Sequence, residues 1–110
     1  MERYWDWQGN YIGVRQRDYL AACDGKILGK FFGKEIYDQN GHYIGEVGRG
    51  GRLIKNKTKE EFRRQGFSEY VRGTITAPLK NCAPYPMIQG MKIFSNRREL
   101  KKREDRWQEW

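Results

Sequence analysis

The sequence predicts a mainly β fold, in which repeated β-hairpins surround a pseudo-symmetric centre and a basic helical tail follows. Three observations predict it: a sixteen-residue repeat, turn signals within each repeat, and a helix-forming basic segment at the end of the chain. At 110 residues the chain has room for one domain. We divide it into hairpin repeats (1–57), a short helix with strands and a proline-rich connection (58–94), and the basic C-terminal helix (95–110).

Two glycine columns and one aliphatic column define the repeat. The first column holds Gly9, Gly25 and Gly41, and the second holds Gly13, Gly29 and Gly45. The aliphatic column, just before the second glycines, holds Ile12, Leu28 and Ile44. Columns that match at a constant spacing indicate one structural unit used repeatedly. We therefore expect the three aliphatic side chains to point into a shared core.

Each repeat has the signature of a β-hairpin. Asp24-Gly25 and Asn40-Gly41 are strong turn signals, because a tight primed turn needs a positive φ that glycine adopts without steric cost. The second glycine of each repeat falls inside the returning strand. A glycine there marks either a bulge or the close approach of another backbone, and both readings stay open.

A fourth repeat starts at Arg52–Asn56, but its register dissolves after Lys57. Whether a fourth hairpin completes the array is open; the segment from Phe67 to Thr76 is one candidate for its return strand. Between them, Thr58 and Glu61 fit a capping box at the start of a short helix that Gly66 would end.

The three turns, Gln8-Gly9 to Gly13, Asp24-Gly25 to Gly29 and Asn40-Gly41 to Gly45, resemble the four-fold beta flower family of small bacterial and phage proteins. The resemblance covers about half of the chain and implies short hairpins around a pseudo-four-fold centre. It implies no activity. The motif is also similar to a string found in PRC-barrel domains, which would use it once or twice in a small barrel.

The last segment predicts a helix. Ser95 is a suitable N-cap, helix-forming residues follow it, and Leu100 lies two turns before Trp107 on the same helical face. We expect Trp107 to dock on the hairpins, the alternative being a helix that presents Trp107 and Trp110 to a partner. Before this helix, the stretch from Met87 to Phe94 predicts a last strand.

The net charge of +8 belongs entirely to the second half of the chain, because residues 1–51 hold equal numbers of basic and acidic side chains. The predicted polyanion-binding residues form two clusters: Lys55, Lys57, Lys59, Arg63 and Arg64, and then Arg97, Arg98, Lys101, Lys102, Arg103 and Arg106. Clustered positive charge attracts nucleic acid through its phosphates, or an acidic protein surface. A solvated, solubilising surface is the plainer explanation of these charges.

No residues predict catalysis, a cofactor or a metal. His42 lies in a turn without further ligands, and Cys23 has no histidine partner in sequence. Asp6 and Asp38 share a column, and turn hydrogen bonding explains them more simply than acid–base chemistry. There is no apolar stretch of membrane-spanning length and no signal-peptide layout, so we expect a cytoplasmic protein with reduced cysteines.

The aromatic residues offer a packing role and a binding role. We expect one of Trp5 and Trp7 to be buried and the other to be at least partly exposed. Candidate interface residues are Trp5, Trp7, Trp107 and Trp110. The sequence thus favours a small non-catalytic protein of a bacterium or mobile element that contacts nucleic acid. The alternative is a protein-interaction module, such as an inhibitor of a host protein, with oligomerisation left open.

Overall fold

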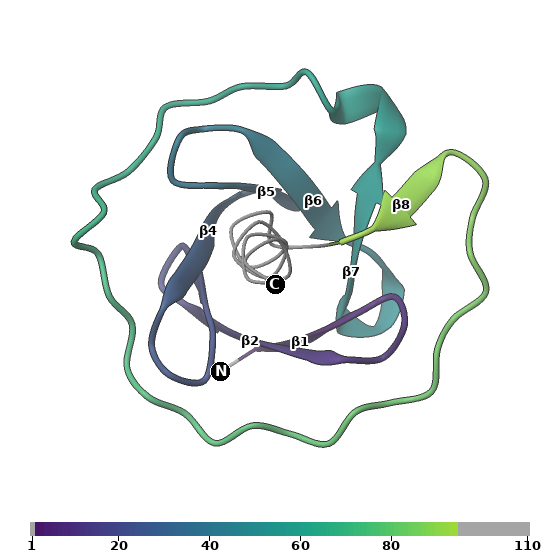
Figure 1. The fold of residues 1–110 in the computed structure, drawn as a ribbon, viewed down its shortest axis with the longest axis horizontal. Helices are drawn as coiled ribbons and strands as arrows, with labels where there is room; N and C mark the ends of the chain where they lie inside the picture. Colours follow the sequence, from purple (N-terminus) through teal and green to yellow (C-terminus); the bar gives the residue numbers. More distant parts are fainter. Residues whose placement is uncertain (1, 95–110) are drawn as a thin grey trace, which may run out of the picture.

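The computed structural model describes residues 2–94 and consists of short β-strands joined by tight turns (Figure 1). The strands are β1 (Arg3–Asp6), β2 (Tyr11–Gln16), β3 (Tyr19–Ala21), β4 (Ile27–Phe32), β5 (Glu35–Tyr37), β6 (Tyr43–Val47), β7 (Arg52–Asn56) and β8 (Met91–Ile93). Two single-turn 3₁₀ helices, η1 (Arg49–Gly51) and η2 (Lys57–Lys59), flank β7.

Seven of these strands form a closed barrel. Each of β1 to β7 pairs antiparallel with the next strand, and β1 also pairs with β7. An up-and-down chain of seven strands has its first and last strands running in the same direction, so the pair that closes the barrel is parallel. Strand β8 pairs with the last residues of β7, Ile54 to Asn56, beyond Arg52 and Leu53, which pair with β1. Ile93 lies opposite Ile54.

The predicted fold class is therefore wrong. The strands form one closed barrel of seven strands with one extra strand, rather than separate hairpins around a centre. No helix of seven or more residues occurs between Glu2 and Phe94. The helix predicted for 95–110 lies outside the described residues and gains no support. The β content was predicted correctly because the turn and alternation signals are local, whereas barrel closure joins strands far apart in sequence.

The predicted turns are confirmed. Gly9, Gly25 and Gly41 have φ values of 91°, 87° and 85°, a region that side chains with a Cβ rarely adopt. In the third turn the amide of Gly41 donates to the carbonyl of Asp38 at 3.0 Å, and the Asp38 carboxylate accepts from the amide of His42 at 2.9 Å. Asp6 accepts from Asn10 in the same way, which confirms the turn role expected for both carboxylates.

The second glycine of each repeat lies at a bulge and also at a close backbone approach. Gly13, Gly29 and Gly45 pair with residues of the preceding strand that directly precede an irregularity in register. A Cβ on Gly13 would overlap the carbonyl oxygen of Ala21, one strand further along. Both possibilities left open by the sequence, a bulge and a close backbone approach, therefore hold. The bulge lies in the strand before each glycine, and the close backbone belongs to the strand after it.

The predicted shared core is present. Leu28 and Ile44 belong to one buried cluster, and Ile12 packs against it while partly buried. Tyr4, Leu20 and Ile36, which share a column of the repeat, are 3%, 0% and 0% exposed in the same cluster. Phe94, directly after β8, is 3% exposed and completes it.

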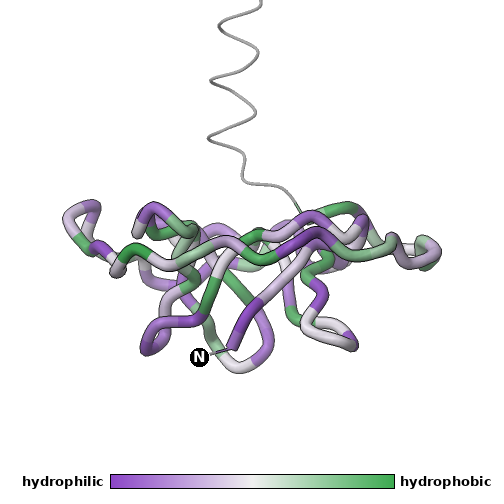
Figure 2. The backbone as a smooth tube through the Cα atoms, turned by 90° about the horizontal axis from the view of Figure 1, so that it is seen from below, coloured by the Kyte–Doolittle hydropathy of each residue, from purple (hydrophilic) through white to green (hydrophobic). Residues whose placement is uncertain are grey.

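Residues 57–90 leave β7 and run around the outside of the barrel before they return as β8; we call this segment the girdle (Figure 1). The amide of Lys57 donates to the carbonyl of Gly90 at 3.0 Å, which joins its two ends. Seen from the side, the girdle is a nearly flat ring and the hairpins project to one side of it (Figure 2). The predicted last strand is confirmed as β8, which pairs with β7 in place of the stretch from Phe67 to Thr76.

The girdle binds the three glycine turns at regular intervals. The amides of Arg64, Gly73 and Cys82 donate to the carbonyls of Gly41, Gly25 and Gly9 at 2.8, 2.8 and 2.7 Å. Three residues later in each case, the amides of Phe67, Thr76 and Tyr85 donate to Gln39, Cys23 and Trp7 at 3.0, 2.9 and 2.9 Å. In both series, successive donors lie nine residues further along the girdle, whereas their acceptors lie sixteen residues earlier in the chain each time. One nine-residue unit of extended chain, at most about 30 Å long, therefore spans each gap between neighbouring turns.

The predicted short helix is shorter than expected. Only η2 forms, and its N-cap is Asn56, whose side chain accepts from the amide of Thr58 at 3.0 Å. The capping residue thus lies two positions before the predicted Thr58, because β7 continues to Asn56 and the chain must turn at once into the girdle.

Candidate nucleic-acid interface

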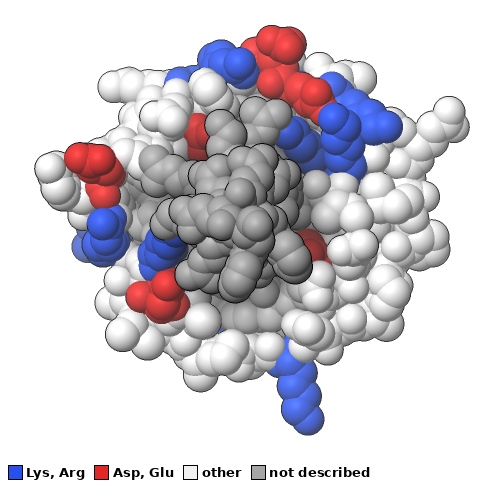
Figure 3. Space-filling model, in the orientation of Figure 1, with Lys and Arg blue, Asp and Glu red and all other residues white. Residues whose placement is uncertain are grey.

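The net positive charge of the described residues lies in 52–94, the part of the chain that includes the girdle. Residues 52–94 contain nine Lys or Arg and three Asp or Glu, whereas residues 1–51 contain equal numbers of basic and acidic side chains. On the visible part of the face in Figure 3, basic side chains lie next to acidic ones at the upper right and at the left, and they form no single basic patch. The candidate interface is therefore a rim of separate cations.

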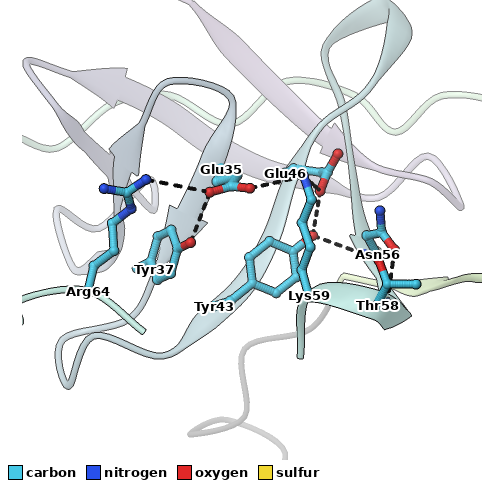
Figure 4. Close-up of polar contacts among 8 residues, drawn as sticks. All are labelled: Glu35, Tyr37, Tyr43, Glu46, Asn56, Thr58, Lys59 and Arg64. Atoms are coloured by element: carbon cyan, nitrogen blue, oxygen red, sulfur yellow. Dashed lines mark hydrogen bonds and ion pairs between the residues drawn. The ribbon is translucent and has the colours of Figure 1, made fainter. Parts of the chain in front are cut away.

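Lys59 and Arg64, two of the predicted polyanion-binding residues, are held by acidic side chains of the third hairpin (Figure 4). The Lys59 ammonium lies 2.9 Å from Glu35 Oε2 and 3.1 Å from Glu46 Oε1. Arg64 lies 4.0 Å from Glu35 Oε1, and its guanidinium stacks over Phe32 with 4.9 Å to the ring centre. Both cations are thus already compensated, and Lys59 fastens the start of the girdle to the barrel.

Two tyrosines extend this polar cluster. Tyr37 donates to Glu35 at 2.9 Å and Tyr43 donates to Glu46 at 2.7 Å, while the Tyr43 oxygen also accepts from the amide of Asn56 at 2.9 Å. Burial, followed by the bond to Glu35, raises the pKa of Tyr37. The hydrogen bond from Lys59 lowers the pKa of Glu35 below its ordinary value. Glu35 therefore stays charged and Tyr37 stays neutral near neutral pH, as a structural clamp requires.

The other predicted residues of the first cluster lie at the surface or near it. Lys57 and Arg63 are exposed, and Arg63 donates to the carbonyls of Phe62 and Glu60 at its own turn. Lys55 is half-buried on β7. Two further exposed cations of the girdle, Arg72 and Lys80, were missed, because each stands alone in the sequence. The predicted residues Arg97, Arg98, Lys101, Lys102, Arg103 and Arg106 lie outside the described residues.

The two N-terminal tryptophans bind the girdle. Trp7 is 2% exposed and its indole donates to the carbonyl of Pro86 at 2.8 Å. Trp5 is half-buried and its indole donates to the carbonyl of Lys80 at 2.9 Å. The expected division into one buried and one partly exposed ring is confirmed, and both rings have internal partners. Trp107 and Trp110 lie outside the described residues.

Arg52 is a buried cation that the sequence did not single out. It occupies the column of Tyr4, Leu20 and Ile36, is 5% exposed, and donates to the carbonyl of Ala83 at 2.8 Å. Its guanidinium lies 3.9 Å from the ring centre of Tyr85, and Arg49 approaches the same ring at 4.7 Å. Arg52 therefore anchors the last third of the girdle and contributes no surface charge.

A cavity of about 610 Å³ opens where the girdle crosses between the second and third glycine turns. The turn side contributes Asp24, Lys26, Ile27 and Gln39, and the girdle contributes 67–72. Here the girdle makes a local turn, in which the amide of Val71 donates to the carbonyl of Ser68 at 3.2 Å. This volume falls within the range of small-molecule sites.

No group of three or more metal-binding side chains is found among residues 2–94. Cys23 and Cys82 are free thiols, and His42 sits in its turn beside Arg63 of the girdle. Within the same range, no helix is long and apolar enough to cross a membrane.

Comparisons with protein-family models, curated proteins and solved structures found no match to this chain. The resemblance to the four-fold beta flower family, and the weaker one to PRC-barrel domains, therefore stay predictions from the sequence.

Proposed function

We propose that this protein is a small non-catalytic binding protein that contacts nucleic acid, or another polyanion, through its girdle. The supporting observation is the position of the charge: residues 52–94 hold an excess of six positive charges, and four exposed cations, besides the ion-paired Arg64, lie along the girdle. These four are Lys57, Arg63, Arg72 and Lys80, and we call them the rim cations. None of them forms an ion pair with a carboxylate of residues 2–94.

Cations spaced around a rim suit a flexible strand better than a rigid duplex. A duplex meets a protein over one side, whereas a single strand bends to follow a curved groove or edge. Backbone contacts of this kind depend on charge and geometry, and they carry no sequence preference. We therefore expect single-stranded DNA or RNA to bind more tightly than duplex, with little dependence on base sequence.

The test is a fluorescence-anisotropy titration with labelled single-stranded and duplex DNA and RNA at several salt concentrations. Replacing all four rim cations with glutamine should flatten the dependence of log Kd on log salt, by about 0.7 for each phosphate of a single strand that the variant no longer neutralises. Replacing Arg15, Arg17 and Lys34, which lie on the barrel outside the girdle, with glutamine is the matched control and should leave the slope unchanged. No binding by the unaltered protein at low salt would remove the proposal.

A protein-interaction module is the second proposal, and the apolar side chains of the girdle support it. Tyr70 and Ile75 are 81% and 82% exposed, and Leu79, Met87 and Ile88 are also exposed. Exposed apolar side chains gathered on one segment are typical of a protein interface. Sedimentation velocity over a range of concentrations separates the two proposals. Self-association that Ile75→Ser and Met87→Ser abolish, without nucleic-acid binding, would favour the interaction module.

A further inference from the structure

The cavity between the second and third glycine turns has a wall with two adjacent cations. Lys26 and Arg72 are partners in an isolated antiparallel bridge, so their side chains emerge on the same side of the bridge, next to each other. Both line the cavity. Like charges opposite each other repel, and neither side chain forms an ion pair with a carboxylate among residues 2–94. An anionic group placed between them would relieve that repulsion.

The Arg72 guanidinium is held in place rather than free to swing away. It donates to the carbonyls of Glu69 and Val71, which are part of the same local turn. The adjacent amide of Gly73 donates to the carbonyl of Gly25 at 2.8 Å, so this turn is tied to the second hairpin next to Lys26. The backbone bridge thus keeps the fixed Arg72 guanidinium beside Lys26 without a ligand.

Aromatic rings form a second wall. Phe67 lines the cavity and packs edge-on against Tyr19, with 5.3 Å between ring centres, so its position is set by the barrel. Tyr70 also lines the cavity and is 81% exposed. An exposed aromatic ring beside a cationic pair is the arrangement that single-strand binding proteins use for a base and its phosphate.

The charges that line the cavity restrict the class of ligand further. Asp24 and Glu69 also line the cavity, so its four charged side chains sum to zero. A ligand that brings only negative charge, such as polyphosphate, gains little from such a site. A ligand with one anionic group, a flat ring and hydrogen-bond donors for the carboxylates fits all of these features. A nucleotide is such a ligand, since its base and sugar supply donors.

We propose that this cavity holds one nucleotide unit of a single-stranded nucleic acid, with its phosphate between Lys26 and Arg72 and its base against Phe67 and Tyr70. The proposal rests on the polyanion-binding function for its class of ligand. It adds that binding depends on the base as well as on the phosphate backbone.

Two labelled oligonucleotides of equal length, about 12 nucleotides, separate backbone from base contributions. One is oligo(dT), and the other carries abasic sites throughout, so it keeps the phosphates and lacks the bases. The unaltered protein should bind oligo(dT) more tightly than the abasic strand. Tyr70→Ala should weaken oligo(dT) binding at least about fivefold, the lower end of what one stacked base supplies, and change abasic binding little.

Ile75→Ala is the matched control, because Ile75 is equally exposed on the same girdle and lies outside the cavity. It should leave both affinities unchanged, and Lys26→Gln should weaken both. Equal affinity of the unaltered protein for the two strands, or equal effects of Tyr70→Ala and Ile75→Ala, would overturn the cavity proposal while the polyanion function stands. Failure to bind either strand would overturn both.

Discussion

Gly41 serves two purposes at one position, and only one of them is visible in the sequence. Its φ of 85° makes the hairpin turn, which the Asn-Gly pair predicts. Its missing side chain also leaves room for the girdle, because a Cβ at Gly41 would overlap the carbonyl oxygen of Arg64. The second purpose escaped prediction, since the segment that docks there lies elsewhere in the chain and carries no matching motif.

Gly41→Ala should therefore destabilise the fold more than Gly33→Ala. Gly33 also has a positive φ, of 63°, but a Cβ there would meet nothing within 4 Å. Gly33→Ala, the control, should lose about 1 kcal/mol of stability from backbone strain alone. Gly41→Ala should lose about 2 kcal/mol more, from the clash and the displaced girdle. Chemical denaturation of both variants measures the difference, and equal losses would show that the girdle does not rest on this turn.

At the scale of elements, the clamp formed by Lys59 joins η2 to the hairpin of β5 and β6. The sequence identified Lys59 as one cation in a basic cluster. The sequence could not reveal that Glu35 and Glu46 come together beside Lys59, because these two residues lie opposite each other only after β5 and β6 pair. A cluster that looked like a binding surface is thus partly a structural contact.

The clamp predicts a specific dependence of stability on pH. Lys59 lowers the pKa of Glu35, so this stabilisation is present above the ordinary glutamate pKa and is lost as pH falls through the lowered value. Glu35 and Glu46 raise the pKa of Lys59, so its contribution is present below the ordinary lysine pKa and is lost as pH rises through the raised value. At neutral pH both contributions are present.

Lys59→Met should accordingly lower the free energy of unfolding by about 1 kcal/mol at pH 7 and by much less near pH 3. Lys57→Met is the control, since Lys57 is exposed and belongs to no ion pair within residues 2–94. Thermal unfolding across the pH range measures both variants. If Lys59→Met lowers the stability equally at pH 3 and pH 7, the ion pairs contribute nothing to folding stability.

At the scale of the whole molecule, a barrel with a sixteen-residue repeat is encircled by a segment with a nine-residue spacing of hydrogen bonds. The amides of Arg64, Gly73 and Cys82, which donate to the glycine turns, should exchange hydrogen slowly. The amides of Gln65, Ile75 and Leu79 lie between these contacts and should exchange quickly. Hydrogen exchange resolved by NMR measures this alternation, and uniformly fast exchange along the girdle would contradict the arrangement.

Local features were predictable and long-range ones were not. The three turns, the aliphatic core column and β8 follow from residue type and spacing within short stretches. The parallel pair of β1 and β7 and the path of the girdle depend on contacts between distant segments, which leave no periodic signal of their own. For the same reason, the cavity could not be foreseen: Lys26 and Arg72 become neighbours only when the girdle crosses the second hairpin.

The most direct test of the proposed interface is a map of amide chemical-shift changes as oligo(dT) is added to the isotope-labelled protein. We expect the largest changes along the girdle, above all at 67–72, and at Lys26 across the cavity. Changes confined to the barrel turns at Arg17-Asp18 and Gly33-Lys34, with the girdle unaffected at saturation, would contradict it.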